Sequence, residues 1–314
     1  LIVHFLALST ETTNYIKWNE NGITVAGGNG FGDELDQLSS ASGICIDDNN
    51  ETIYIVDTGN DRIVRWKKDA TSGEIVAGGN GPGDQNDQLN TPVNVIIDHK
   101  NDSLIISDRG NRRIVRWSRQ YEGEGETIIL NIDGYGLAMD RNGYLYVSDL
   151  KNSEVKRWRI GEKNGILVAG GNGIGNHLNQ FNKPCYIFVD KNESIYVSDS
   201  NNHRVMKWMK GATEGTVVAG GQESGNNLTQ LSYPWGIYVD QFETLYIADS
   251  GNRRIMGWLK GAREGIVIVG ENSGGSEGNQ LMWPIDLAFD RHNNLYVIDL
   301  ENVSVQKFLI DSSK

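Results

Sequence analysis

A block of about fifty residues recurs six times along this chain, and it constrains the fold more than any other feature of the sequence. Each copy contains an Asp, an Asn at the third position after it and a large aromatic residue at the ninth. The copies are Asp57/Asn60/Trp66, Asp108/Asn111/Trp117, Asp149/Asn152/Trp158, Asp199/Asn202/Trp208, Asp249/Asn252/Trp258 and Asp299/Asn302/Phe308. A period of this length predicts a repeat architecture in which each copy is one structural unit.

Each unit contains short segments rich in Val, Ile and Tyr, separated by Asn, Asp and Gly. The first segment ends in an Asp, as in IYVD at 237–240, and the second ends at the Asp of the repeat, as in LYIAD at 245–249. The third runs to the aromatic residue, and the fourth reads IVAGG at 75–79. Segments of this kind predict four antiparallel strands per unit. We therefore expect an all-β fold, a six-bladed β-propeller.

The two ends of the chain predict how the ring closes. The sixth unit ends at Phe308 without a fourth strand, whereas residues 23–28 (ITVAGG) form a fourth-strand pattern without a preceding unit. We expect this N-terminal strand to complete the last blade, because closure removes open sheet edges. The expected domains are a peripheral segment or signal-peptide remnant at 1–20, one propeller at 21–310 and a tail at 311–314.

The repeat resembles the NHL-repeat family of six-bladed propellers. The matching motifs are Pro-x-Gly-Ile-x-Val-Asp, Leu-Tyr-Val-x-Asp and Asn-x-Arg-Val, and PWGIYVD at 234–240 with the following LYIADSGNRRIM is the nearest copy. The resemblance covers roughly residues 21–308. It implies a ring-shaped scaffold, and it brings three precedents: lactonase-type propellers with a divalent cation, amidating lyases with a three-His metal site, and propellers that bind RNA through a basic face.

The Asp and aromatic residues of the repeat are expected to be structural. An Arg follows the Asn in four units, at Arg62, Arg113, Arg204 and Arg254, whereas Glu154 and Ser304 stand there in units three and six. We predict a charge-assisted pair between Asp and Arg that joins the second strand to the third. Catalytic groups are not normally copied into every blade, so we expect this set to be structural.

One position breaks the repeat in alternate units. The residue four places before the Asp of the first strand is Gly43, Gly136 or Gly236 in odd units, and Asn94, Tyr186 or Asp286 in even units. These three polar side chains are expected to point toward the central channel, with Tyr135, Trp235 and Trp283 beside them. Departures from a scaffold rule are where function is expected. We therefore take Asn94, Tyr135, Tyr186, Trp235, Trp283 and Asp286 as the candidate ligand-binding residues of the channel mouth.

The leading functional hypothesis is a non-enzymatic interaction scaffold that binds a protein, peptide or glycan. Segments 29–42, 80–91, 172–183, 222–233 and 271–283 differ more than the strands do, and loops on a rigid scaffold are common recognition sites. No cofactor is expected under this hypothesis. The Gly-rich stretches such as GGNGFG at 27–32 lack the helix or the Lys-Ser/Thr that phosphate binding requires.

Two alternatives stay open. A metal-dependent hydrolase or lyase of the lactonase type would hold a divalent cation at Asn94 and Asp286, although no matching Glu is evident. An RNA-binding propeller would use the arginines of unit two, Arg109, Arg112, Arg113, Arg116 and Arg119. Nucleic-acid binding normally needs a broad positive surface, whereas this chain has 41 acidic residues, 29 Lys plus Arg and a net charge of −12.

The remaining expectations concern the setting of the domain. Cys45 and Cys185 belong to blades on opposite sides of the ring, so we predict no disulfide between them. No apolar stretch of about 20 residues predicts a membrane span. The apolar start LIVHFLAL favours secretion, and we expect a monomeric domain.

Overall fold

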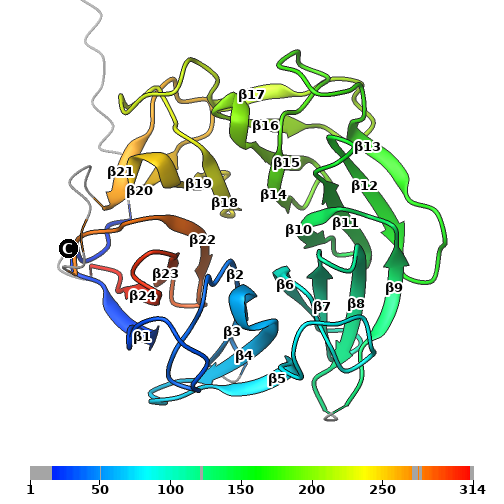
Figure 1. The fold of residues 1–314 in the computed structure, drawn as a ribbon. Helices are drawn as coiled ribbons and strands as arrows, with labels where there is room; N and C mark the ends of the chain where they lie inside the picture. Colours follow the sequence, from blue (N-terminus) through cyan, green and yellow to red (C-terminus); the bar gives the residue numbers. More distant parts are fainter. Residues whose placement is uncertain (1–15, 50, 121–122, 271–274, 276–277, 312–314) are drawn as a thin grey trace, which may run out of the picture.

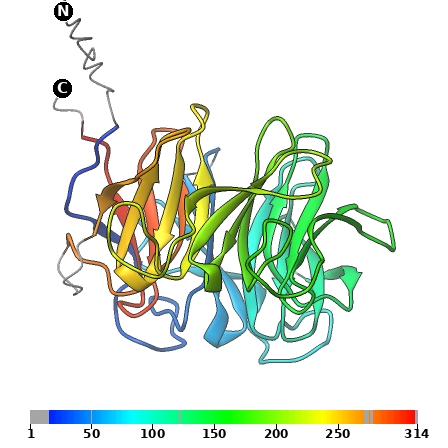
Figure 2. The same cartoon turned by 90° about the horizontal axis from the view of Figure 1, so that it is seen from above.

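The computed structural model describes residues 16–49, 51–120, 123–270, 275 and 278–311. They form six four-stranded antiparallel sheets. The sheets stand as blades around one axis (Figure 1), and their strands run between the two faces of the ring (Figure 2). The predicted all-β six-bladed propeller is confirmed.

The chain fills the blades in order, from the axis outward. Blade one is β2 (Gly43–Asp47), β3 (Thr52–Asp57), β4 (Arg62–Lys67) and β5 (Glu74–Gly78); blade two is β6 (Pro92–Asp98), β7 (Ser103–Asp108), β8 (Arg113–Ser118) and β9 (Glu126–Leu130); blade three is β10 (Gly134–Met139), β11 (Tyr144–Asp149), β12 (Glu154–Arg159) and β13 (Ile166–Gly170). Blade four is β14 (Pro184–Val189), β15 (Ile195–Asp199), β16 (Arg204–Trp208) and β17 (Thr216–Gly220); blade five is β18 (Pro234–Val239), β19 (Leu245–Asp249), β20 (Arg254–Trp258) and β21 (Ile266–Val269). Single 3-10 turns, η1 (Thr58–Asn60), η2 (Ser200–Asn202) and η3 (Ser250–Asn252), follow the second strand in blades one, four and five.

Blade six combines both ends of the chain. Its strands are β22 (Pro284–Phe289), β23 (Leu295–Asp299), β24 (Ser304–Phe308) and β1 (Ile23–Gly27). β1 pairs antiparallel with β24, with Ile23 opposite Lys307 and Gly27 opposite Ser304. The predicted closure by an N-terminal strand is confirmed, and it ties residues about 280 positions apart into one sheet.

Buried aromatic residues and aspartates mark the same place in every blade. The aromatic residue of the third strand is at most 5% exposed in Trp66, Trp117, Trp158, Trp208, Trp258 and Phe308. The aspartates at the end of the second strand are at most 3% exposed in Asp57, Asp108, Asp149, Asp199, Asp249 and Asp299. A carboxylate this deeply buried needs hydrogen-bond donors to offset its desolvation.

An Asp–Arg clamp supplies those donors in four blades. Asp57 Oδ2 accepts hydrogen bonds from Arg62 Nε at 2.7 Å and from Asn60 Nδ2 at 2.8 Å. The other guanidinium nitrogens of Arg62 donate to the carbonyls of Asp33 and Glu34, in the loop that enters the blade. The same Asp–Arg pair measures 2.6 Å in blade two, 2.7 Å in blade four and 2.8 Å in blade five. The clamp therefore joins two strands and also fixes the preceding loop.

In the two units without Arg, other groups donate hydrogen bonds to the buried Asp. In blade three, Glu154 pairs with Lys156, and Asp149 accepts from the amide and side chain of Asn152. The connection into this blade is short, so it has no long loop to hold. In blade six, Asp299 accepts the backbone N–H groups of Met282 and Trp283.

Trp18 lies between blades five and six. It is 7% exposed, its ring centroid lies 5.8 Å from those of Tyr246 and Phe289, and its Nε1 donates to the carbonyl of Asn293. The sequence placed residues 1–20 at the periphery, but this indole is part of the core. Most of that segment, residues 1–15, lies outside the described residues.

Two further observations concern the setting. Cys45 and Cys185 are both free thiols. Within the part of the chain that the structure describes, no helix has the length and apolar character needed to cross a bilayer.

The clamp predicts that removing a buried carboxylate lowers the free energy of unfolding far more than removing an exposed one. Asp249→Ala leaves the buried Arg254 guanidinium without its partner, and we expect a loss of about 3–5 kcal/mol in the free energy of unfolding. Glu126→Ala breaks the Arg116–Glu126 pair, whose Glu side chain is 62% exposed, and should cost about 1 kcal/mol or less. Urea unfolding of both variants checks this; similar losses would contradict the role of the clamp.

Candidate functional site at the ring axis

The alternation of Gly and polar residues has a steric cause. The inner strands converge on the axis, and a Cβ on Gly136 would lie 2.4 Å from the carbonyl oxygen of Cys185 and 2.9 Å from Cα of Tyr186. A Cβ on Gly236 would lie 2.6 Å from Cα of Asp286, and one on Gly43 would lie 3.0 Å from Cα of Asn94. Each Gly therefore makes room for the backbone of the next blade, and the polar side chain of that blade enters the axis.

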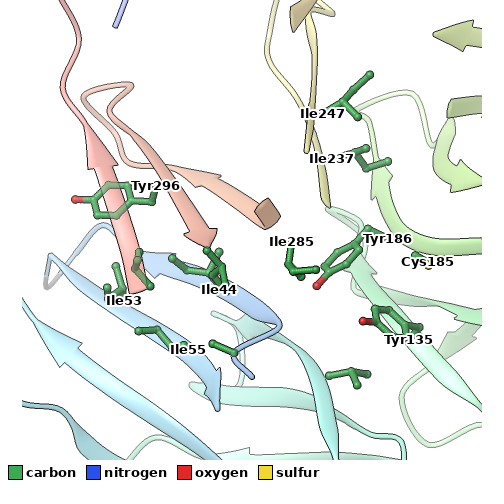
Figure 3. Packing of buried hydrophobic residues seen from close by; sticks show 14 of the residues in the cluster. Ile44, Ile53, Ile55, Tyr135, Cys185, Tyr186, Ile237, Ile247, Ile285 and Tyr296 are labelled. Carbon is green, nitrogen blue, oxygen red and sulfur yellow. The ribbon is translucent and has the colours of Figure 1, made fainter. Parts of the chain in front are cut away.

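Tyr186 crosses the axis. Its ring comes from blade four, and its hydroxyl donates to the carbonyl of Ser42 in blade one. Figure 3 shows the hydroxyls of Tyr186 and Tyr135 on the axial side of their strands. Tyr186 is 4% exposed, and burial raises its pKa well above the ordinary value. Its hydroxyl is therefore a neutral hydrogen-bond donor that links opposite sides of the ring.

Asp286 and Asn94 use their side-chain oxygens in the same way. Asp286 Oδ2 accepts from the backbone N–H of Ile44 at 3.0 Å, and Oδ1 accepts from that of Leu287 at 2.9 Å. Asn94 Oδ1 accepts from the backbone N–H of Leu137 at 3.3 Å. Both residues are 5% exposed. Burial raises the pKa of Asp286 to about 8, although the two N–H donors act in the opposite direction.

Aromatic side chains of blades three to five pack together at this level. The ring centroid of Tyr135 lies 5.6 Å from that of Tyr186 and 5.4 Å from that of Trp235. Trp235 and Trp283 are partly exposed and pack against the axial core. Lys183 Nζ lies 4.6 Å from the Trp235 ring centroid, and the Arg109 guanidinium lies 5.9 Å from that of Tyr135.

The six candidate residues thus fall into a buried group and a partly exposed group. Asn94, Tyr135, Tyr186 and Asp286 are at most 5% exposed, with Tyr135 and Tyr186 in ring contact. Trp235 touches both tyrosines and, like Trp283, also reaches solvent. Contact of any of the six with a ligand stays a prediction. Lys183 and Arg109 were not among the candidates for the channel mouth, and their proximity to aromatic rings in other blades has no signal in the sequence.

The axial oxygens are a poor donor set for a divalent cation. Both Asp286 oxygens and the Asn94 oxygen already accept backbone N–H groups, so metal binding would leave buried N–H donors unpaired. Among the described residues, no three His, Cys, Asp or Glu side chains are grouped to hold a metal ion. We derive no chemistry through a metal at this site.

The arginines of blade two are largely neutralised by carboxylates. Arg109 pairs with Asp133, Arg113 with Asp108 and Arg116 with Glu126. Arg119 pairs with Asp47 and Asp102. Phosphate binding depends on positive surface charge, which these carboxylates offset, so the pairs disfavour the RNA-binding alternative.

The long loops that enter the blades have a common structure, although the sequence analysis stressed their differences. A fully buried Leu or Phe anchors each of the five long loops, and the Gln before it holds the start of the loop in four blades, as in Gln37 Nε2 to the Asn29 carbonyl at 3.0 Å. The anchors are Leu38, Leu89, Phe181, Leu231 and Leu281. The repeated Gln-Leu pair was a usable signal. What differs among the loops is their exposed apolar side chains: Phe31 is 64%, Ile174 67% and Tyr233 44% exposed.

Comparison with solved structures identifies proteins of the same fold. An auxiliary nutrient binding protein from Bacteroides ovatus has a TM-score of 0.72 at 12% identity, covering 95% of this chain and 78% of that one. A gluconolactonase from Xanthomonas campestris has a TM-score of 0.65 at 12% identity, covering 88% of each chain. A catalytically inactive virginiamycin B lyase from Staphylococcus aureus, solved with quinupristin, has a TM-score of 0.58 at 11% identity and covers 95% of this chain and 90% of that one. No protein-family model and no curated protein matches the sequence. At these identities the likeness establishes the propeller fold.

Asp286 predicts a pH dependence of stability. Its pKa is about 8 in the folded protein against an ordinary 3.8, so the folded state holds the extra proton between these values. The free energy of unfolding therefore falls as pH rises through this window, by up to about 1.4 kcal/mol per pH unit, and levels off above pH 8.

Asp286→Asn isolates this effect. The neighbouring Tyr135, Tyr186 and Cys45 have pKa values raised by burial, so they stay protonated across the window. In urea unfolding at pH 5, 6, 7 and 8, the free energy of unfolding of the variant should increase relative to that of the wild type as pH rises. A constant difference between the two proteins would mean that Asp286 does not titrate there.

Proposed function

We propose that this chain is a non-enzymatic binding module of the NHL-repeat type that recognises a peptide, protein or glycan. The binding face is the channel mouth with the loops that enter the blades. Trp235 stands at the start of β18, and the loops precede the inner strands, so both belong to one face of the ring. The NHL assignment rests on the repeated motifs of the sequence.

The observation that supports the proposal most is that the axial polar atoms are engaged in hydrogen bonds within the ring. The oxygens of Asp286, Asn94 and Tyr186 all hold neighbouring blades together through backbone groups. A general acid, a general base or a nucleophile must have a polar atom within reach of the substrate. These atoms are buried and engaged, so they serve the scaffold.

The chemistry of the mouth suits recognition. Trp235 offers a partly exposed aromatic surface, on which a sugar ring or an apolar side chain can pack. Lys183 next to it has no ion pair with a described residue, so its ammonium group is available to an acidic group of a ligand. We therefore favour a ligand that combines an apolar or sugar surface with a carboxylate.

The loops add a second, pre-organised surface. The clamps and buried anchors fix the loop backbone, while Phe31, Ile174 and Tyr233 remain exposed. A rigid loop loses little conformational entropy on binding, so exposed apolar side chains on it contribute more of their interaction energy to affinity.

A metal-dependent lactonase or lyase is the rival hypothesis. Enzymes and binding proteins share this fold, so the fold does not choose between them. The rival requires a rise in thermal midpoint with Ca²⁺, Mg²⁺ or Zn²⁺ that disappears in Asp286→Ala. The engaged axial oxygens lead us to rank it second.

Substitutions at the two ends of one strand test the binding face. Trp235 lies near the start of β18 and Phe242, which is 70% exposed, follows its end, so the two aromatic residues of blade five lie on opposite faces of the ring. The wild type is first screened on glycan and peptide arrays. We expect Trp235→Ala and Lys183→Ala to weaken binding of the selected ligand at least about tenfold, the loss of one good contact.

Phe242→Ala is the matched control and should bind like the wild type. Thermal melting shows whether each variant is folded, and Lys183→Ala leaves the aromatic packing in place. Equal affinities in all four proteins would reject the mouth as the binding site. A ligand that loses affinity only in Phe242→Ala would place recognition on the opposite face.

A further inference from the structure

A cavity of about 350 Å³ lies between blade six and blade one, where the ring closes. Ile46, Ile53 and Trp66 of blade one line it, together with Val25 and Tyr296 of blade six. Asp290 and Glu51 contribute carboxylates. Asp290 follows the end of β22, so this cavity opens on the face of the ring opposite the channel mouth. Figure 3 shows Tyr296 and Ile53 in this part of the ring.

The corresponding gap between blades one and two contains a guanidinium group of the protein itself. Arg119 pairs with Asp47 and Asp102, and its Nε donates to the hydroxyl of Tyr54 at 3.1 Å. The guanidinium lies 5.4 Å from the Tyr54 ring centroid. The Arg119 side chain is 11% exposed. Two carboxylates and a tyrosine from neighbouring blades therefore form a built guanidinium site.

The repeat places the same three groups at the closure gap. Asp290 corresponds to Asp47, since each ends the first strand of its blade, and Tyr296 corresponds to Tyr54 in strand register. Glu51 corresponds to Asp102, and both have left-handed backbones in equivalent turns, with φ of 50° and 46°. All three groups of the guanidinium site are thus present around the cavity.

Two groups differ at the closure gap: Asn294 Nδ2 donates to Asp290 Oδ2 at 2.8 Å, and the cation is a lysine. Lys68 stands where blade two has Arg119, two residues after the buried Trp. Its ammonium pairs with Glu51 of its own blade at 2.6 Å, and its side chain is 59% exposed. Lys307 Nζ lies 3.6 Å from Asp290 Oδ2 and 4.9 Å from the Tyr296 ring centroid. Lys68 stays within its own blade, whereas Arg119 reaches Asp47 of the neighbouring blade.

The lysines and arginine that line the cavity are equal in number to the carboxylates that line it. Lys67, Lys68, Arg291 and Lys307 each pair with a carboxylate. The carboxylates of Asp48 and Asp69, which also line the cavity, form no ion pair with a described residue. Lys68 and Arg291 share Glu51, so the four cations of the lining face four carboxylates, of which Asp48 and Asp69 are outside the ion pairs.

We propose that this closure cavity binds an alkylguanidinium group, with Asp290, Tyr296 and Glu51 taking the roles of Asp47, Tyr54 and Asp102. The aliphatic stem would pack on Ile46 and Ile53, as long basic side chains commonly pack on apolar surface. The chemistry is shared by small guanidines and by an arginine side chain of a peptide. The site is separate from the channel mouth, so either proposal can fail without the other.

Calorimetric titration with agmatine tests the site directly. We expect binding to the wild type and a loss of at least about tenfold in affinity in Asp290→Asn, which removes the charge that faces the guanidinium. In Lys68→Arg the protein's own guanidinium competes for the site as a tethered group, and agmatine affinity should fall by a similar factor. Lys210→Arg makes the same exchange in blade four, at a lysine paired with Glu193, and should change nothing.

Two peptides distinguish the sources of the guanidinium. An acetylated Gly-Arg-Gly amide that binds more tightly than agmatine would assign the site to a partner's arginine, and the reverse order would assign it to a small guanidine. A peptide with citrulline in place of Arg should not bind. The proposal is overturned if agmatine and the Arg peptide fail to bind below about 10 mM. It is also overturned if Lys68→Arg binds like the wild type, or if the citrulline peptide matches the Arg peptide.

Discussion

The close approach of six inner strands at the axis is the constraint on which this structure depends. Gly43, Gly136 and Gly236 let the backbone of the next blade come within contact distance of their own. The space that remains accepts side chains from alternate blades, and Asn94, Tyr186 and Asp286 fill it. Because each of these side chains bonds to a backbone group of another residue, the axis acts as a core. We therefore propose that recognition uses the mouth, the loops and the gaps between blades.

The Asp–Arg clamp connects this core to the surface. One buried carboxylate holds the guanidinium, and the guanidinium in turn holds loop carbonyls, so blade and loop form one hydrogen-bonded unit. Charge-assisted hydrogen bonds in a low-dielectric interior are strong, and partial loss is costly. The same chemistry recurs between blades one and two, where Arg119 joins neighbouring blades. The gap at ring closure has the carboxylates and tyrosine of that arrangement but a lysine that turns outward.

The sequence predicted the architecture well and the site less well, for physical reasons. The number of repeat copies determines blade number, and the missing fourth strand of unit six required closure by β1. The even–odd alternation was visible in the sequence, but which atoms the polar side chains would bind was not. Bonds such as that of Asp286 to Ile44 join residues far apart in the chain. The insertion of Trp18 between blades five and six had no counterpart in the repeat, since no other unit carries a preceding segment.

Comparing the unfolding free energies of Gly136→Ala and Gly123→Ala tests the axial constraint most directly. A Cβ on Gly136 meets backbone atoms of blade four, which cannot move aside without shifting the inner strand, whereas one on Gly123 meets nothing within 4 Å. The account predicts a loss of about 3 kcal/mol for Gly136→Ala and a change within about 0.5 kcal/mol for Gly123→Ala in urea unfolding. Equal stabilities would contradict the claim that contact between inner strands sets which side chains enter the axis.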